Sequence, residues 1–231
     1  MDNSKEQVNR LKTFLKYLNK KTDNFILKGS LALDLCYFPC DCNKHIINLD
    51  AKEFEGIIEY VSDYCAEHKL SYHIGRDDNS VTKVYISDNN DSHIIKVVVF
   101  YRKSNIRSED YTVINGIHTY RLARIVQMKA VKYAIDGKLN DIYNIAYIVT
   151  HFPKEISRDI LNTVFDAVES QGFYYIDDLI MFQCNEDFPI KDFLDNYFGM
   201  LQKIDFYYER EDFETLCTKT QEILKENGIK W

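Results

Sequence analysis

The sequence predicts an α+β protein, with a mixed β-sheet flanked by helices in its first half and a helical bundle in its second half. Short strand-like apolar segments alternate with amphipathic segments up to residue 101, whereas from residue 117 onward the apolar residues recur at helical spacing. Only 8 Gly and 3 Pro occur among 231 residues, which favours long helices over many short strands. We predict two domains, residues 1–115 and 116–231, with the Asn115-Gly116 turn at their boundary.

In the first half, apolar periodicity predicts three helices and about five strands. The strongest strand segment is 94–101, because it contains the apolar run from Val97 to Tyr101. The predicted helices cover residues 7–18, 31–37 and 54–70, and the predicted strands cover residues 25–27, 46–50, 71–74, 81–86 and 94–101.

The second half reads as helix throughout, over residues 120–135, 142–149, 156–170, 190–208 and 213–226. Aromatic residues are concentrated at 173–175 and 206–208. We expect them in the core rather than at an interface with another protein, since aromatic side chains supply much of a core's buried area.

Charge and hydropathy limit the possible partners. The net charge is −7, so the molecule as a whole repels nucleic acid, and a phosphate-bearing partner requires a local basic patch. No run of 18 apolar residues occurs and the first ten residues are polar, so we expect a cytoplasmic protein that does not enter a membrane.

The cysteines do not form a recognisable metal or disulfide pattern. Six are spread along the chain, which in an intracellular protein predicts reduced thiols. Cys36, Cys40 and Cys42 lie close together before His45, but their spacing matches no common zinc site. The zinc-protease helix, the serine-hydrolase elbow and the P-loop are also missing from the sequence.

The segment from Phe25 to Leu33 predicts a phosphate-binding turn. A short apolar strand runs into Lys28-Gly29-Ser30, and helical spacing begins directly afterwards. Such a turn places backbone N–H groups and the Ser30 hydroxyl at a helix N-terminus, an arrangement that suits a triphosphate. Gly29 lets the backbone approach the phosphates closely because it has no Cβ. The alternative is an ordinary strand-to-helix connection.

A second group of charged residues follows the predicted boundary. Arg121, Arg124, Lys129 and Lys132 lie largely on one side of a helix, opposite an apolar side, and Asp141 follows in the next helical segment. Each charge alone could be part of a solvated surface. Together they form the best predicted anion site on this acidic chain.

These segments resemble the AbiEii/AbiGii-like nucleotidyltransferases, the toxins of abortive-infection and type IV toxin–antitoxin systems in bacteria. Lys28, Gly29, Ser30 and Leu33 match the family's Leu-Lys-Gly-Gly/Ser-x-x-Leu turn, and Lys129, Asp141 and Tyr143 match its later Lys-x-x-Ala-Leu and Arg-Asp-x-Tyr-Asp elements. The resemblance covers about residues 24–150. It implies a nucleotidyltransferase-like fold that transfers a nucleoside monophosphate from an NTP to an acceptor such as tRNA, and a cognate antitoxin as partner.

The resemblance also implies roles for individual residues. Asp50 with Asn48 would hold Mg²⁺ against the phosphates, which Lys28, Gly29, Ser30, Arg121, Arg124 and Lys132 would bind. Lys129 would neutralise charge in the transition state, and Asp141 would orient Lys129 or act as a base.

The sequence departs from the family where a metal ion would bind. The family's two aspartates fall on Ile46 and Asn48 in one strand register, and on Asn48 and Asp50 in the other. Both registers use the same strand face, so alternation does not choose between them. Neither supplies two carboxylates, and Asn140 and Asn144 replace further charged residues of the family's pattern. The alternative function is therefore a catalytically impaired protein of this fold that binds a nucleotide or a protein partner.

Overall fold

The computed structural model describes residues 3–40, 45–88, 92–101, 106–137 and 139–170, together with six isolated residues between 215 and 226. The chain divides into two compact units, Met1–Arg121 and Leu122–Trp231.

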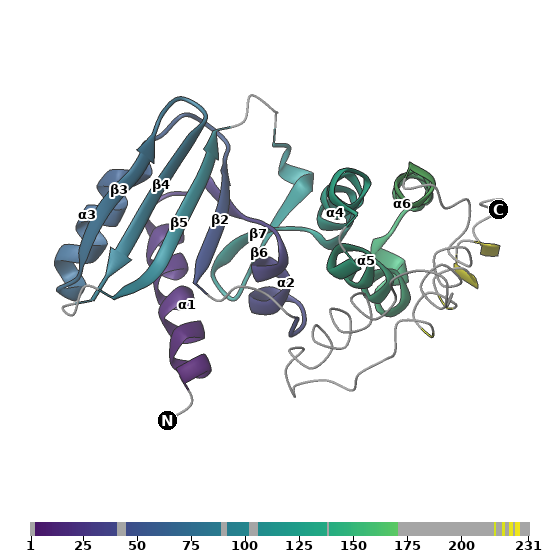
Figure 1. Ribbon diagram of the computed structural model, residues 1–231, viewed down its shortest axis with the longest axis horizontal. Coiled ribbons are helices and arrows are strands. Elements are labelled where there is room, and N and C mark those ends of the chain that lie inside the picture. Colours follow the sequence, from purple (N-terminus) through teal and green to yellow (C-terminus); the bar gives the residue numbers. More distant parts are fainter. Residues whose placement is uncertain are drawn as a thin grey trace, which may run out of the picture. The chain divides into compact units, whose positions relative to one another are not determined.

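The first unit is built on a seven-stranded sheet in the order β3-β4-β5-β2-β1-β7-β6 (Figure 1). Its strands are β1 (Phe25–Leu27), β2 (Ile46–Ala51), β3 (Ser71–Asp77), β4 (Val81–Ser87), β5 (His93–Tyr101), β6 (Tyr111–Ile114) and β7 (Ile117–Tyr120). The sheet is mixed, because β2 runs parallel to β5 and β1 parallel to β7, while the other neighbours are antiparallel. The predicted α+β class is thus confirmed.

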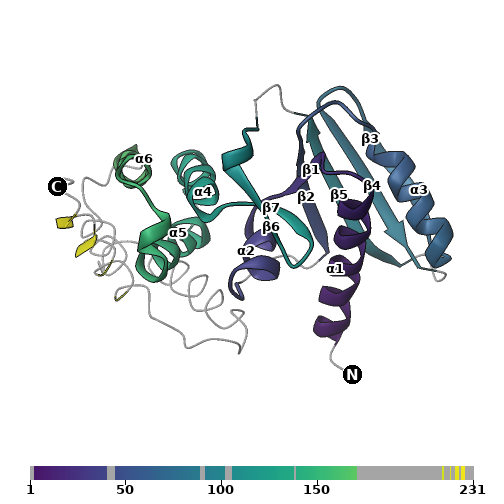
Figure 2. The ribbon, with the colours of Figure 1, turned by 180° about the vertical axis from the view of Figure 1, so that it is seen from behind.

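Three helices accompany the sheet: α1 (Asn3–Lys21), α2 (Ser30–Cys36) and α3 (Ile57–His68). Helices α1 and α3 lie against one face of the sheet (Figure 2). On that face the side chains of the central strands are fully buried, for example Ile47, Leu49, Val97 and Val99, each at most 1 % exposed. The alternation seen in the sequence therefore reflects a sheet with one deeply buried face.

The sheet has two strands more than predicted, because the β6–β7 hairpin was missed. Asn115 and Gly116 have φ values of 52° and 79°, as the two central residues of a tight hairpin turn of the mirror-image type require. Strand β7 pairs in parallel with β1, so the hairpin belongs to the sheet. The boundary between the two compact units lies after Arg121, so both strands of the hairpin fall in the first unit.

The described part of the second unit contains α4 (Leu122–Asp136), α5 (Leu139–His151) and α6 (Arg158–Ser170). Helix α4 packs against both α5 and α6. The predicted helix 190–208 and both aromatic segments lie outside the described residues, and of 213–226 only isolated helical residues are described. Among the helices that are described, none has the length and apolar character needed to cross a bilayer.

Candidate functional site

The turn between β1 and α2 has the conformation expected of a close backbone approach. Gly29 has a φ of 78°, in the region that residues with a side chain rarely adopt. A Cβ placed on Gly29 would meet no other atom within 4 Å, so space lies open beside its backbone. Ser30 follows at the start of α2 and is partly exposed. A phosphate could therefore approach the backbone of this turn.

Asp50 lies next to this turn in space and is buried, at 3 % exposure. Lys28 forms a short ion pair with its Oδ1 atom, and the hydroxyl of Tyr120 donates a hydrogen bond of 3.0 Å to its Oδ2 atom. Both carboxylate oxygens of Asp50 thus have a partner within the first unit.

The strand pairing explains why Lys28 reaches Asp50. Ile26 is the antiparallel partner of Asp50, and Lys28 follows two residues later on the same face of the sheet. The Lys28 backbone N–H donates a hydrogen bond of 3.0 Å to the carbonyl of Asn48, so the residue after β1 stays bound to β2 at the turn. The Lys28 ammonium also lies 3.8 Å from the centre of the Phe100 ring.

The face of the sheet that carries Asp50 is called the Asp50 face below. The registers of β2, β5 and β4 place nine side chains on it: Ile46, Asn48, Asp50, Lys96, Val98, Phe100, Val81, Lys83 and Tyr85. Most of them are partly exposed, in contrast to the buried opposite face.

With the Lys28 ammonium in contact with Asp50, the Asp50 face does not fit a divalent cation held by the protein alone. Mg²⁺ prefers several oxygen ligands in an octahedral arrangement. Of the nine side chains only Asp50 carries a carboxylate, Asn48 adds an amide, and a lysine ammonium already contacts Asp50. Among the described residues, no three His, Cys, Asp or Glu side chains come together as a metal site.

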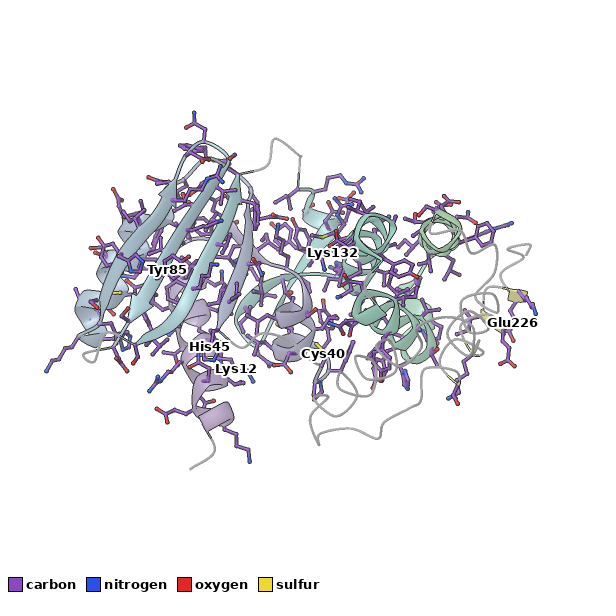
Figure 3. The ribbon with its side chains drawn as sticks, viewed as in Figure 1. Lys12, Cys40, His45, Tyr85, Lys132 and Glu226 are labelled. Atoms are coloured by element: carbon purple, nitrogen blue, oxygen red, sulfur yellow. The ribbon has the colours of Figure 1, made fainter. Side chains whose placement is uncertain are left out.

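Farther along the Asp50 face, basic and aromatic side chains lie in a row, called the Tyr85 row below. Its members are Lys83, Tyr85, Lys96 and, on the neighbouring strand β3, His73. The Tyr85 ring stacks on that of His73, with 4.7 Å between ring centres and 6° between planes. The Lys96 ammonium lies 5.4 Å from the centre of the same Tyr85 ring, and Lys83 is two residues before Tyr85 on β4. Figure 3 shows Tyr85 over β4, on the face turned toward the viewer.

The second unit contains a cationic cluster around the buried Asp141. Lys129 on α4 is 4 % exposed and its Nζ lies 2.8 Å from Oδ1 of Asp141 on α5, while Nζ of Lys132 lies 2.6 Å from Oδ2. Burial opposes ionisation of Asp141, but the two lysines outweigh it and hold the pKa of this carboxyl below its usual value. Two ammonium groups therefore share one carboxylate, and these three side chains together carry one more positive than negative charge.

The spacing predicted that the positive residues of this region lie largely on one side of a helix, opposite an apolar side. The structure does not show this arrangement. Lys129 lies on the buried side of α4 with Ile125 and Val126, whereas Lys132 is exposed. Arg121 precedes α4 and belongs to the first unit, where its backbone N–H donates to the carbonyl of Asp110. Arg124 is half-buried and hydrogen-bonds Gln127 at 3.1 Å. Burial of Lys129 is explained by its partner Asp141, since a charge is buried in proteins mainly when it is paired.

The predicted site residues thus form two groups. In the first unit the structure brings Lys28, Asn48 and Asp50 together beside the Gly29 turn. In the second unit it brings together Lys129, Lys132 and Asp141. A single site shared by both groups stays a prediction.

Tyr120, Phe100 and the Tyr85 row were not identified from the sequence as parts of a site. Strand alternation could have placed Phe100 on one face of β5. Which residues lie beside it on that face depends on which strands pair with β5, and this order is not encoded in local spacing.

The cysteines show no binding role among the described residues. Burial raises the pKa of the Cys36 thiol to about 11, Cys40 donates to the Ser30 carbonyl, and Cys42 lies outside the described part of the chain.

No protein-family model and no curated protein matches this chain. Solved structures do match. A crystal structure of JHP933 from Helicobacter pylori has 18 % sequence identity and a TM-score of 0.66, covering 99 % of this chain and 94 % of that protein. An H. pylori protein described as a "putative nucleotidyltransferase" has 18 % identity and a TM-score of 0.65, covering 99 % of this chain and 97 % of its own. The chain therefore has a nucleotidyltransferase-like fold.

Proposed function

We propose that this chain is a nucleotidyltransferase of the AbiEii/AbiGii type, which binds an NTP at the Gly29 turn and transfers a nucleoside monophosphate to an acceptor such as tRNA. The observation that carries the proposal is the position of the Gly29 turn next to Asp50, on a fold shared with a nucleotidyltransferase-like neighbour. The attacking acceptor oxygen would form a bond to the α-phosphorus as the bond to pyrophosphate breaks.

The backbone of Gly29 and the hydroxyl of Ser30 would bind the phosphates, since open space adjoins Gly29. We assign phosphate binding also to Lys28, Arg121, Arg124 and Lys132, and stabilisation of transition-state charge to Lys129, positioned by Asp141. These roles follow the resemblance. The lysine pair around Asp141 supports them, because its net positive charge suits an anionic ligand.

The row on the Asp50 face supports a nucleic acid as the acceptor. Lys83 and Lys96 flank an aromatic ring on a protein whose net charge is −7. Single-stranded nucleic acid is commonly bound by lysines that contact phosphates and by aromatic rings that stack on bases. An RNA end lying over this row would remain on the same face as Asp50.

The test is transfer of label from α-³²P-NTP to tRNA. We expect labelling by the natural protein and its loss in Asp50→Ala and Lys129→Ala. The matched controls are Asp63→Ala and Lys154→Ala, which remove exposed charges of the same kind elsewhere in each unit and should keep activity. Full labelling by either site variant would overturn the mechanism.

A second candidate function, nucleotide or partner binding without transfer, is favoured by the single carboxylate on the Asp50 face. Thermal stabilisation by each NTP, measured in EDTA and in Mg²⁺, separates the two. Equal stabilisation in both buffers without a labelled product supports binding alone. Turnover that requires the metal ion rejects it and supports transfer with Mg²⁺. Any antitoxin partner is likewise a proposal from the resemblance.

A further inference from the structure

The ion pair between Lys28 and Asp50 has an unusual setting for a structural salt bridge. Both side chains are buried, at 9 % and 4 % side-chain exposure, yet they lie on the sheet face whose other side chains are mostly partly exposed. A positive charge is thus placed on the one carboxylate of a face where the fold family implies a divalent cation.

The surroundings of Lys28 favour an ammonium group over a metal ion. The ammonium lies 3.8 Å from the centre of the Phe100 ring, and an aromatic face attracts an organic cation. A hard cation such as Mg²⁺ gains nothing comparable there, because it requires oxygen ligands. Phe100 is the strand partner of Asp50 on β5, and Ile26 is its partner on β1, so neither partner supplies a side-chain oxygen at this level. The hydroxyl of Tyr120 is the neighbouring oxygen, and it already donates a hydrogen bond to Asp50.

We propose that the Lys28 ammonium is the resident cation of this site, lying against Asp50 where a divalent metal ion would have to bind. The free protein then excludes Mg²⁺ and Mn²⁺ from Asp50 and Asn48, and Lys28 is the residue that excludes them. A metal ion would have to displace an ammonium that is paired, shielded from water and seated on an aromatic ring. The proposal rests on the proposed function only in taking the Asp50 face as the nucleotide site.

The test counts bound Mn²⁺ without nucleotide, by electron paramagnetic resonance of the free ion. We expect the same number of Mn²⁺ ions on the natural protein and on Asp50→Asn. Lys28→Met should bind one additional Mn²⁺, which is lost again in Lys28→Met/Asp50→Asn. Lys28→Arg is the matched control, since it keeps a cation at this position and should gain no site.

Two results would overturn the proposal. One is the loss of a bound Mn²⁺ from the natural protein when Asp50 is changed. The other is a folded Lys28→Met variant that gains no site, which would reduce the pair to a structural salt bridge.

A measurement on the natural protein keeps the test decisive if the variants do not fold. With ¹⁵N-labelled protein, the amide signals of Asn48 and Asp50 should keep their intensity at Mn²⁺ concentrations that broaden exposed acidic segments. Selective loss of these two signals contradicts the proposal. Because no nucleotide is present, failure here is distinct from failure of the proposed function, which is judged by NTP binding and transfer.

Discussion

In the described part of the chain, the buried charged side chains belong to two groups, each with one carboxylate and its lysine partners. Asp50 is paired with Lys28 in the first unit, and Asp141 is shared by Lys129 and Lys132 in the second. The two carboxylates differ in their second partner, which is a tyrosine hydroxyl for Asp50 and a second ammonium for Asp141. Removing Lys28 takes the cation away from the buried Asp50, and removing Asp141 takes the carboxylate away from the buried Lys129. Breaking a buried ion pair from one side is costly in proteins.

We expect Lys28→Met to lower the free energy of unfolding by about 3–5 kcal/mol, the usual cost of breaking a buried ion pair from one side. The double variant Lys28→Met/Asp50→Leu should recover much of this loss, because neither charge remains buried. Urea unfolding of the natural protein, Lys28→Met, Asp50→Leu and the double variant gives the four free energies of a double-mutant cycle. Additive losses would show that the two side chains do not interact.

The lowered pKa of Asp141 makes the stability of the second unit pH-dependent. A carboxyl whose pKa is lower in the folded state stabilises the protein above its unfolded pKa, about 3.9, and loses this contribution as the pH falls through the folded pKa. Asp141→Asn should therefore be less stable than the natural protein at pH 7, by on the order of 3 kcal/mol. The difference should shrink below about pH 4. Denaturant unfolding at several pH values measures it, and a constant difference would contradict the assignment.

At the scale of elements, two glycine turns perform different tasks with the same positive φ. Gly29 joins β1 to α2 with a φ of 78°, and Gly116 closes the β6–β7 hairpin with a φ of 79°. Only the first lies beside a charged site, so the hairpin turn is a natural control for backbone strain.

Gly29→Ala and Gly116→Ala should each destabilise the protein by about 1–3 kcal/mol, because a Cβ is disfavoured at this φ. Only Gly29→Ala should also weaken NTP binding, measured by isothermal titration. Equal NTP affinity in both variants would remove the Gly29 turn from the site.

At the scale of the whole molecule, the negative net charge makes any nucleic-acid contact depend on few lysines. Lys83→Glu/Lys96→Glu should weaken binding of single-stranded RNA at least tenfold at low salt, and the natural protein should lose affinity as salt rises. Fluorescence anisotropy with labelled RNA measures both. Lys154→Glu/Lys225→Glu, at exposed positions of the second unit, makes the same change in net charge and should have a smaller effect. Equal effects of the two double variants would indicate a general charge effect.

Much of the fold was predictable because local patterns are sufficient for it. The strands at 25–27 and 46–50 and the helices after them follow from apolar periodicity, and the structure shows them within a few residues of the predicted bounds. The β6–β7 hairpin was missed although Asn115-Gly116 is a strong hairpin signal, because its strands are only four residues each.

The sequence by itself determined the α+β class, the conformation required at Gly29 and the scarcity of carboxylates on the Asp50 strand, since each depends on residue identity and local spacing. Only the tertiary structure decided that Lys28 neutralises Asp50, that Phe100 lies beside them and that Lys129 is buried against Asp141. These pairs join residues from different strands and helices, and their meeting depends on strand order and helix packing, which local patterns do not encode.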